Sequence, residues 1–259
     1  MDSKPARPDA NPFDDPVAAR RYFRYWKTCL GKAVFALEIQ ALRELLDAPS
    51  PARVLDLGCG SGHFAIALAR AGFQLAAVDA SDAMLREARA GHGEDGRRVQ
   101  WIQAKMECLP FPDHSFDVVV QIVSLEFALD WRTALGEIRR VVRPGGSYIV
   151  GLACHKSLFS AMKPARRHLI QEIAPSGVTA ALGWGPPDAR REVVRIPPLC
   201  IPGMGAIAPW LDDRMGQLGF GGALCLYRFR AGTPVSAAPD AVSSAVTQRP
   251  GEFARREQR

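Results

Sequence analysis

The chain has 259 residues, 47% of them hydrophobic and 23% charged, which is enough apolar material for the core of one large globular domain. It contains no apolar run of the roughly eighteen residues that a membrane-spanning helix needs, and its polar, Pro-rich start lacks the apolar run of a secretory signal. These features predict a cytoplasmic protein that has no contact with a membrane.

The distribution of charge argues against a nucleic-acid-binding protein, and the spacing of the cysteines argues against a metal site. The net charge of +6 comes from scattered Lys and Arg rather than from a coherent basic stripe, so no nucleic-acid partner is predicted. The six cysteines lie far apart without a CxxC pair, which predicts buried or free thiols and no metal site. Three of them, Cys154, Cys200 and Cys225, follow the core. Packing in the interior explains them better than a thiol site for a metalloid acceptor.

The expected elements alternate along the first half of the chain. Residues 1–16 are rich in Pro and Asp and are expected to be flexible, and apolar residues recur at helical spacing over 17–50. Strands are expected at 53–58, 74–80, 98–104, 115–124 and 147–153, and helices at 62–72, 81–90 and 130–142. This alternation predicts an α/β protein with a Rossmann-like, doubly wound and mostly parallel sheet.

Beyond residue 153 the pattern is less regular. Residues 155–174 have helical character with a break near Pro164, and 175–208 are dense in Gly and Pro. An apolar stripe over 207–218 predicts a helix, and alternation over 223–230 predicts an antiparallel closing strand. Residues 233–259 are small and polar and are expected to be disordered.

The stretch VLDLGCGSG, residues 54–62, has the strongest chemical signal. It places a carboxylate, Asp56, before glycines at 58, 60 and 62, where the first strand turns into its helix. Bare backbone there lets a ligand approach closely. A dinucleotide would bring a pyrophosphate, which Asp56 repels, and the third glycine of GxGxxG falls on His63. One carboxylate–cation pair is worth roughly 4 kcal/mol before desolvation, so the loop favours a cationic ligand.

A second carboxylate, Asp79, ends the second expected strand, nineteen residues after Gly60. An acid at this place accepts hydrogen bonds from ribose hydroxyls in nucleotide-binding sheets. S-adenosylmethionine carries both an ammonium group and an adenosine ribose, so it fits both carboxylates.

At this point the sequence resembles the class I S-adenosylmethionine-dependent methyltransferases, in the group that includes ubiquinone and menaquinone biosynthesis enzymes. The matching blocks are VLDLGCGSG (54–62), VDAS (78–81) with Met84, LPFPDHSFDVVV (109–120) and RRVVRPGG (139–146). The resemblance implies a seven-stranded sheet, N-terminal lid helices over 17–50, a cofactor-binding core at 53–153 and a substrate-side insertion at 155–205, all within a methyltransferase domain over 17–232. The cofactor-binding residues predicted in this way are Asp56, Gly58, Cys59, Gly60, Gly62, Asp79, Ala80, Met84, Met106, Glu107 and Gln121.

The chain departs from the family pattern at two places. Lys105 stands where members carry an acid that accepts from the adenine amino group, and a lysine cannot accept. Either cofactor affinity is lowered or the pocket has lost the cofactor; the remaining glycines and carboxylates favour the first. Phe127 replaces a His that many relatives carry, so any role of that His is absent.

Acceptor-side residues are harder to identify. Hydroxyl acceptors need a base, whereas nitrogen, sulfur or enolate-like carbon acceptors can do without one. His155 and Glu126, near the ends of the fifth and fourth strands, are the candidate catalytic residues. For both residues a structural explanation carries more weight: His155 as a loop histidine, and Glu126 as a capping or paired surface acid. Tyr22, Tyr25 and Trp26 are predicted to line the lid over the acceptor, although helical spacing also suits core packing.

The sequence therefore predicts an S-adenosylmethionine-dependent methyltransferase that acts on a small-molecule acceptor as a monomer or homodimer. A protein that keeps the fold but serves as a binding or assembly partner is the alternative, and Lys105 is the feature that favours it.

Overall fold

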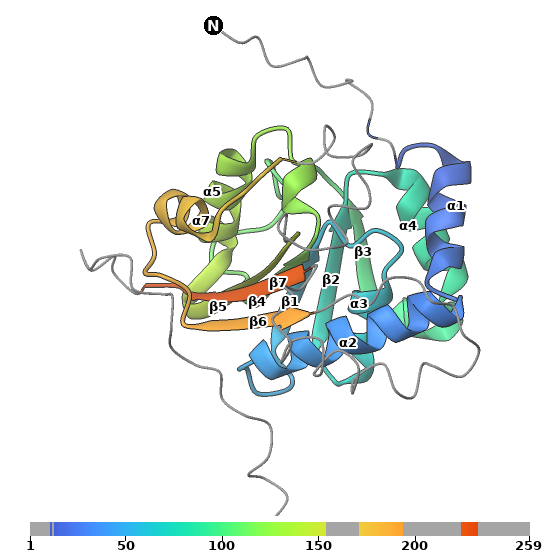
Figure 1. Ribbon diagram of the computed structural model, residues 1–259, viewed down its shortest axis with the longest axis horizontal. Helices are drawn as coiled ribbons and strands as arrows, with labels where there is room; N and C mark the ends of the chain where they lie inside the picture. The colour runs from blue at the N-terminus through green and yellow to red at the C-terminus, as the bar shows by residue number, and fades with distance from the viewer. Residues whose placement is uncertain (1–10, 12, 154–170, 194–223, 233–259) are drawn as a thin grey trace, which may run out of the picture.

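The structure, a computed structural model, describes residues 11, 13–153, 171–193 and 224–232 (Figure 1). The expected flexible termini before residue 11 and after 232, the helix over 207–218 and most of the 155–205 insertion lie outside these residues. Among the described residues, no helix combines the length and apolarity needed to cross a membrane.

Seven strands form one mixed sheet in the order β3-β2-β1-β4-β5-β7-β6. The first five are parallel, and β7 runs antiparallel to both β5 and β6. The strands are β1 (Arg53–Leu57), β2 (Gln74–Asp79), β3 (Val99–Gln103), β4 (Phe116–Ile122), β5 (Val142–Ala153), β6 (Ala189–Val193) and β7 (Leu224–Arg230). The doubly wound sheet and its antiparallel closing strand are confirmed.

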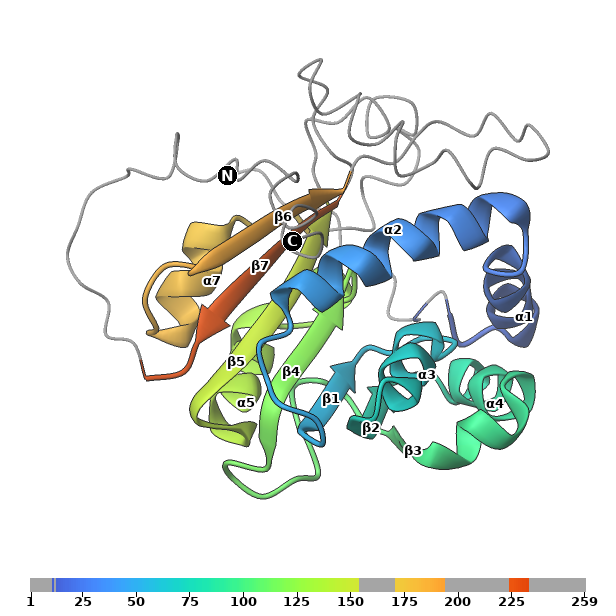
Figure 2. The ribbon, with the colours of Figure 1, turned by 90° about the horizontal axis from the view of Figure 1, so that it is seen from below.

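Helices cover both faces of this sheet (Figure 2). On one face lie α2 (Cys29–Leu45), α3 (His63–Arg70) and α4 (Asp82–Gly91). Helix α2 packs against β6 and β7, whereas α3 and α4 pack against β2 and β3. On the other face α5 (Trp131–Val141) and α7 (Pro175–Leu182) pack against β4 and β5. Helix α1 (Pro16–Tyr25) lies against α4, and short 3₁₀ turns, η1 (Gly93–Arg98) and η2 (Leu125–Phe127), precede β3 and α5.

Local sequence explains where several helices begin. The side chains of Asp15, Thr28, Ser81 and Asp130 each accept a hydrogen bond from a backbone N–H in the first turn of α1, α2, α4 and α5. Such N-caps satisfy donors that a helix leaves unpaired. The central strands follow from continuous apolar runs: four of the five β1 residues are buried, which is typical of strands covered on both faces.

Sequence patterns assign no helix or strand to the Gly- and Pro-rich stretch over 175–208. Helix α7 and strand β6 lie there. Pro175 opens α7 and Gly183, with φ of 65°, ends it, so both residues mark the helix rather than a loop. Strand β6 carries few apolar side chains and exists because β7 supplies its hydrogen-bonding partners.

The cysteines also differ from expectation at one position. Cys29, Cys59 and Cys108 are free thiols, as predicted, but Cys225 on β7 is disulfide-bonded. Spacing along the chain does not show which cysteines the fold brings together.

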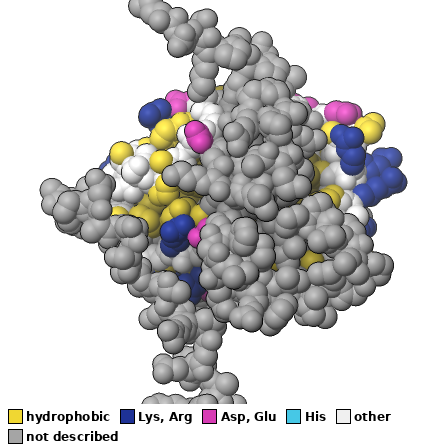
Figure 3. Space-filling view, in the orientation of Figure 1, with side chains coloured by type: hydrophobic (Ala, Val, Ile, Leu, Met, Phe, Trp, Pro, Cys, Tyr) yellow, Lys and Arg dark blue, Asp and Glu magenta, His cyan; other side chains and the backbone are white. Residues whose placement is uncertain are grey.

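On the face shown in Figure 3, Lys and Arg side chains lie at several separate places.

Candidate functional site

The glycine loop, residues 58–62, lies at the carboxyl end of β1, between β2 and β4, where the strand order reverses direction. Ligands of doubly wound sheets bind at this kind of position. Gly58, Gly60 and Gly62 have φ of 71°, 53° and 79°. A side chain would be strained at all three positions, which explains why the loop is stripped of them.

Asp79 connects the glycine loop to the end of β2. Its Oδ2 accepts from the Gly60 N–H at 2.8 Å, and its Oδ1 accepts from the Ser81 N–H at 2.9 Å. Burial raises the pKa of Asp79, with the Asp14 carboxylate adding to the rise, while the Ser81 and Gly60 N–H groups lower it. The two predicted carboxylate motifs therefore belong to one site.

Asp56 is the buried charge of this site. Its side chain is 2% exposed, and Oδ2 has no hydrogen-bond partner among the described residues. Burial raises its pKa to about 7, opposed by the Ala65 N–H and assisted by the nearby Asp79. A buried carboxylate oxygen without a partner is costly, so this position suits a donor or cation that the described residues do not supply.

The glycines differ in what surrounds them. A Cβ on Gly58 would lie 2.4 Å from the Cβ and Oγ of Ser124, and one on Gly62 would lie 2.4 Å from the Trp101 ring. A Cβ on Gly60 would meet only Tyr22 Cε1, at 3.5 Å, within the described residues. Gly58 and Gly62 are thus required by packing, whereas Gly60 faces the open side of the loop.

Several other predicted cofactor residues lie around this loop. Met84 is buried, and its N–H donates to Ser81 Oγ at 3.2 Å; the Ala80 carbonyl accepts from Gln103 Nε2, and Cys59 is a buried thiol. The methyl end of Met106 reaches to 3.9 Å from the Cβ position on Gly58. Lys105, at the end of β3, is exposed.

Two predicted cofactor residues are engaged by protein groups. Gln121 is fully buried: its Oε1 accepts from the Tyr148 hydroxyl at 2.6 Å, and its Nε2 donates to Met106 Sδ at 3.4 Å. Glu107 Oε1 accepts from the Leu129 and Asp130 N–H groups. These bonds assign Gln121 to holding Met106 and Glu107 to holding the turn before α5, and direct contact with a cofactor stays a prediction for both.

The structure describes one of the two candidate catalytic residues. His155 lies outside the described residues. Glu126 is 1% exposed, so it is not the surface acid that the alternative interpretation expected. Its Oε1 accepts a hydrogen bond from the Ala153 N–H at 2.9 Å. This bond joins η2 to the end of β5, so Glu126 has a structural contact whatever its chemical role.

The predicted lid residues separate into two groups. Tyr22 lies over Gly60, and the Trp26 ring lies 5.8 Å from the Tyr22 ring and 5.6 Å from that of His63. Tyr25 is 37% exposed. Burial lowers the pKa of His63 to about 3, with His92 and Lys27 contributing, so this ring is neutral and packs under the lid.

Sequence reasoning missed Phe13 and Ser124. The Phe13 ring contacts those of Tyr22 and Phe127, both at 5.7 Å, and its carbonyl accepts from Ser81 Oγ at 2.7 Å. The three rings come from three separate segments, which no local pattern reveals. Ser124 has a signal that was available: it lies just after β4, at the edge of the sheet where ligands bind.

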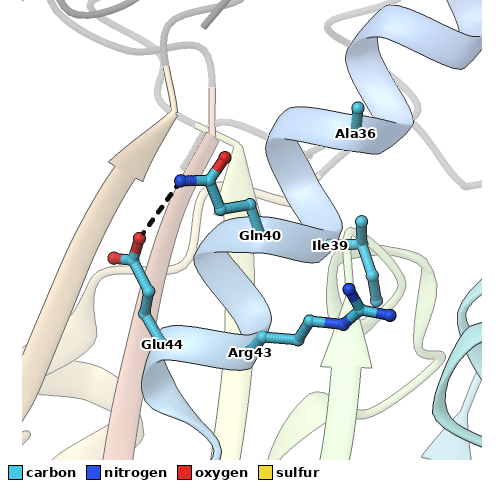
Figure 4. Close-up of a pocket in the computed structure, with 5 residues that line it drawn as sticks. All are labelled: Ala36, Ile39, Gln40, Arg43 and Glu44. Atoms are coloured by element: carbon cyan, nitrogen blue, oxygen red, sulfur yellow. Dashed lines mark hydrogen bonds between the residues drawn. The ribbon is translucent and has the colours of Figure 1, made fainter. Parts of the chain in front are cut away.

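A separate pocket of about 520 Å³ lies along α2 (Figure 4). Its described lining residues are Ala36, Ile39, Gln40, Arg43 and Glu44. None of them is a candidate site residue.

Within the described part of the chain, no group of three His, Cys, Asp or Glu side chains is placed to hold a metal ion.

Comparison with known proteins adds independent findings. Residues 55–150 match the family described as a methyltransferase domain. A malonyl-[acyl-carrier protein] O-methyltransferase from Pectobacterium atrosepticum is 29% identical over 51% of this chain and 61% of its own length. A demethylmenaquinone methyltransferase from Clavibacter sepedonicus is 38% identical over 38% of this chain and 40% of its own.

Solved structures show the same fold. A crystal structure from Thermotoga maritima, described as an S-adenosylmethionine-dependent methyltransferase and possible histamine N-methyltransferase, has a TM-score of 0.63 and 21% identity. The structural match covers 85% of this chain and 98% of the Thermotoga maritima chain. The chain spans about half the length, 48%, of the first curated relatives it matches.

Proposed function

Because residues 55–150 match a methyltransferase-domain family, we propose that this protein transfers a methyl group from S-adenosylmethionine to a small-molecule acceptor. The observation that carries the proposal is the buried Asp56 Oδ2 without a partner among the described residues, beside a loop whose backbone is open at Gly60. This oxygen suits the ammonium group of the donor and disfavours a pyrophosphate.

The residues present fit this cofactor. Asp56 would bind the ammonium group, the backbone of Gly58 to Gly62 would lie against the methionine and ribose, and Asp79 would accept from the ribose hydroxyls. The bound donor would supply an activated methyl group on a sulfonium. The protein contributes by holding the acceptor at attack distance in a site closed to water. Tyr22 and Trp26, placed over the glycine loop, are suited to that closure.

Ligand binding tests the proposal directly. With S-adenosylmethionine at one hundred times its Kd, linkage predicts a stabilisation of about 2.7 kcal/mol, a rise in Tm of roughly 5–10 °C. NAD⁺ is the matched control, because it offers the same adenosine with a pyrophosphate. Stabilisation by NAD⁺ alone, or by neither ligand at millimolar concentration, would contradict the proposal.

The identity of the acceptor is a separate question. The names of the two relatives above concern a carrier-protein thioester and a quinone precursor, and for this chain we propose only a small molecule. Incubating a cell extract with the protein and isotopically labelled methyl donor, followed by mass spectrometry, would identify it. A protein that binds the donor but forms no S-adenosylhomocysteine with any acceptor pool would support the binding-partner alternative, which the exposed Lys105 favours.

Glu126→Gln separates a catalytic from a structural role. Gln keeps an oxygen that accepts from the Ala153 N–H but cannot take a proton. If Glu126 is the base, we expect kcat to fall by about 100-fold or more while Tm changes by less than about 3 °C. Glu126→Ala is the control that also removes the structural bond, and it should lower Tm. Unchanged kcat in the Gln variant would restrict Glu126 to the structural contact.

A further inference from the structure

The backbone at the end of β4 has an unusual conformation. Val123 has φ of 49°, in the left-handed region that β-branched residues very rarely adopt. It is held there by a hydrogen bond from its N–H to the Gly151 carbonyl at 2.8 Å. Strained residues of this kind persist only when their surroundings impose them, and they concentrate at functional sites.

The turn at Val123 directs the next side chain onto the glycine loop. Ser124 is 9% exposed, and its Oγ donates to the Leu57 carbonyl at 2.9 Å. Its Cβ and Oγ occupy the space beside Gly58 where a side chain would otherwise lie. Leu57 is the last residue of β1, so Ser124 is bonded to the backbone at the start of the candidate cofactor loop.

Ser124 also precedes the turn η2, as its N-cap residue. Its carbonyl accepts from the Phe127 N–H at 3.1 Å, and η2 carries both Glu126 and Phe127. Glu126 is bonded to Ala153 of β5, and the Phe127 ring contacts Phe13. One residue therefore joins the loop that would hold the methyl donor to the turn that carries the candidate catalytic residue Glu126.

We propose that Ser124 is a positioning residue for methyl transfer, which couples the glycine loop to η2 and is turned into place by the left-handed backbone of Val123. This inference rests on the proposed function, because only a donor bound at the glycine loop gives the coupling a purpose. Neither residue contacts the donor through a side chain in this assignment. Their effect is exerted through Leu57, Gly58 and Phe127.

The strain is tested in the ligand-free protein by comparing Val123→Gly with Val123→Ala. Both variants lose the same side-chain packing, so backbone conformation is what differs between them. At an ordinary position the Gly variant is the less stable one, but at φ of 49° it should melt about 2–4 °C above the Ala variant. The usual order, with Ala more stable, would show that Val123 is not strained and would overturn this part of the inference.

The coupling is tested by hydrogen exchange of the full chain with and without S-adenosylhomocysteine, which needs no acceptor. In the wild type we expect the ligand to slow exchange at 58–62 and 125–127 by about fivefold or more. In Ser124→Ala, protection at 58–62 should stay within about twofold, while protection at 125–127 should fall by about threefold or more. Ser115→Ala is the matched control, because Ser115 is 7% exposed and its Oγ likewise donates to a backbone carbonyl, that of Pro112.

Each outcome decides a different point. Unchanged protection at 125–127 in Ser124→Ala, or an equal loss in Ser115→Ala, would overturn the coupling, because a merely structural role moves both variants alike. Wild-type protein that gains no protection from the ligand at either segment would count against the proposed function instead. In that case ligand-free exchange at 125–127 still tests the link: Ser124→Ala should speed it, Ser115→Ala should not, and any other pattern overturns the link.

Discussion

Asp56→Asn is expected to weaken S-adenosylmethionine binding by about 100-fold or more and, at pH 8, to make the ligand-free protein more stable than the wild type. The two effects have one cause. The Asp56 carboxylate is buried, and Oδ2 has no partner among the described residues, so its charge destabilises the empty protein and favours a cation. Asn has the same shape without the charge.

The size of the stabilisation follows from the pKa. A rise from 3.8 to about 7 corresponds to on the order of 4 kcal/mol for an ionised, fully buried carboxylate. We expect about half of this from the substitution, because the Asn NH₂ brings two donors that also need partners. Thermal unfolding at pH 8 should then show a Tm raised by about 4–8 °C.

The same pKa predicts opposite pH dependences for stability and affinity. Between about pH 4 and 7 the folded protein retains a proton on Asp56 that the unfolded chain has lost, so this group's contribution to stability falls as the pH rises through that window. Ligand affinity rises over pH 6 to 8, because the ammonium group binds the ionised carboxylate. Below pH 7, Kd should increase about tenfold for each unit that the pH is lowered.

Calorimetric titrations at pH 6, 7 and 8 on wild type and Asp56→Asn measure both effects. Asp113→Asn is the control, because this carboxylate is 67% exposed and lies away from the glycine loop. The Asp56→Asn variant should lose the tenfold-per-unit dependence of Kd below pH 7. A variant that binds normally, or one that melts below the wild type at pH 8, would mean that Asp56 does not carry the proposed role.

Gly58→Ala and Gly60→Ala should have different effects on stability and binding, although the two positions lie only two residues apart. Both positions have a left-handed φ, which costs a side chain about 1–2 kcal/mol. At Gly58 the added methyl also overlaps Ser124, and forcing it in should cost a further 1–3 kcal/mol by roughly the penalty of overpacking. We therefore expect unfolding free energies lowered by about 3 kcal/mol in Gly58→Ala and about 1 kcal/mol in Gly60→Ala.

Binding should be affected most directly at Gly60. A methyl group there has room in the described structure, and it would project into the side of the loop where we place the ligand. Gly60→Ala should thus remain folded and weaken S-adenosylmethionine binding by about 30-fold or more. Urea unfolding and calorimetry give the two quantities. Combining Gly58→Ala with Ser124→Gly should recover part of the stability that Gly58→Ala loses. If Gly60→Ala proves more destabilising than Gly58→Ala, the assignment of Gly60 to the open side of the glycine loop is wrong.

Much of the fold was determined by the sequence alone. The strands from β1 to β5 and the helices between them follow from local causes: apolar runs, side-chain N-caps such as Ser81, and a helix-ending glycine at position 72. The glycine loop and its two carboxylates were found for the same reason, because a ligand that touches backbone imposes residue types at adjacent positions. Contacts between neighbours in the chain leave a readable pattern.

The tertiary structure alone decided which distant residues meet. The Gln121 side chain is held between Tyr148 and Met106, and only the packing of β4 on β5 sets where it points. The contacts of Ser124 with Gly58 and of Phe13 with Phe127 depend likewise on segments far apart in the sequence. Strand β6 forms because β7 offers it hydrogen-bonding partners, not because of its own residues. Such contacts are set by strand order and register, which are properties of the whole chain and leave no mark on any short stretch of it.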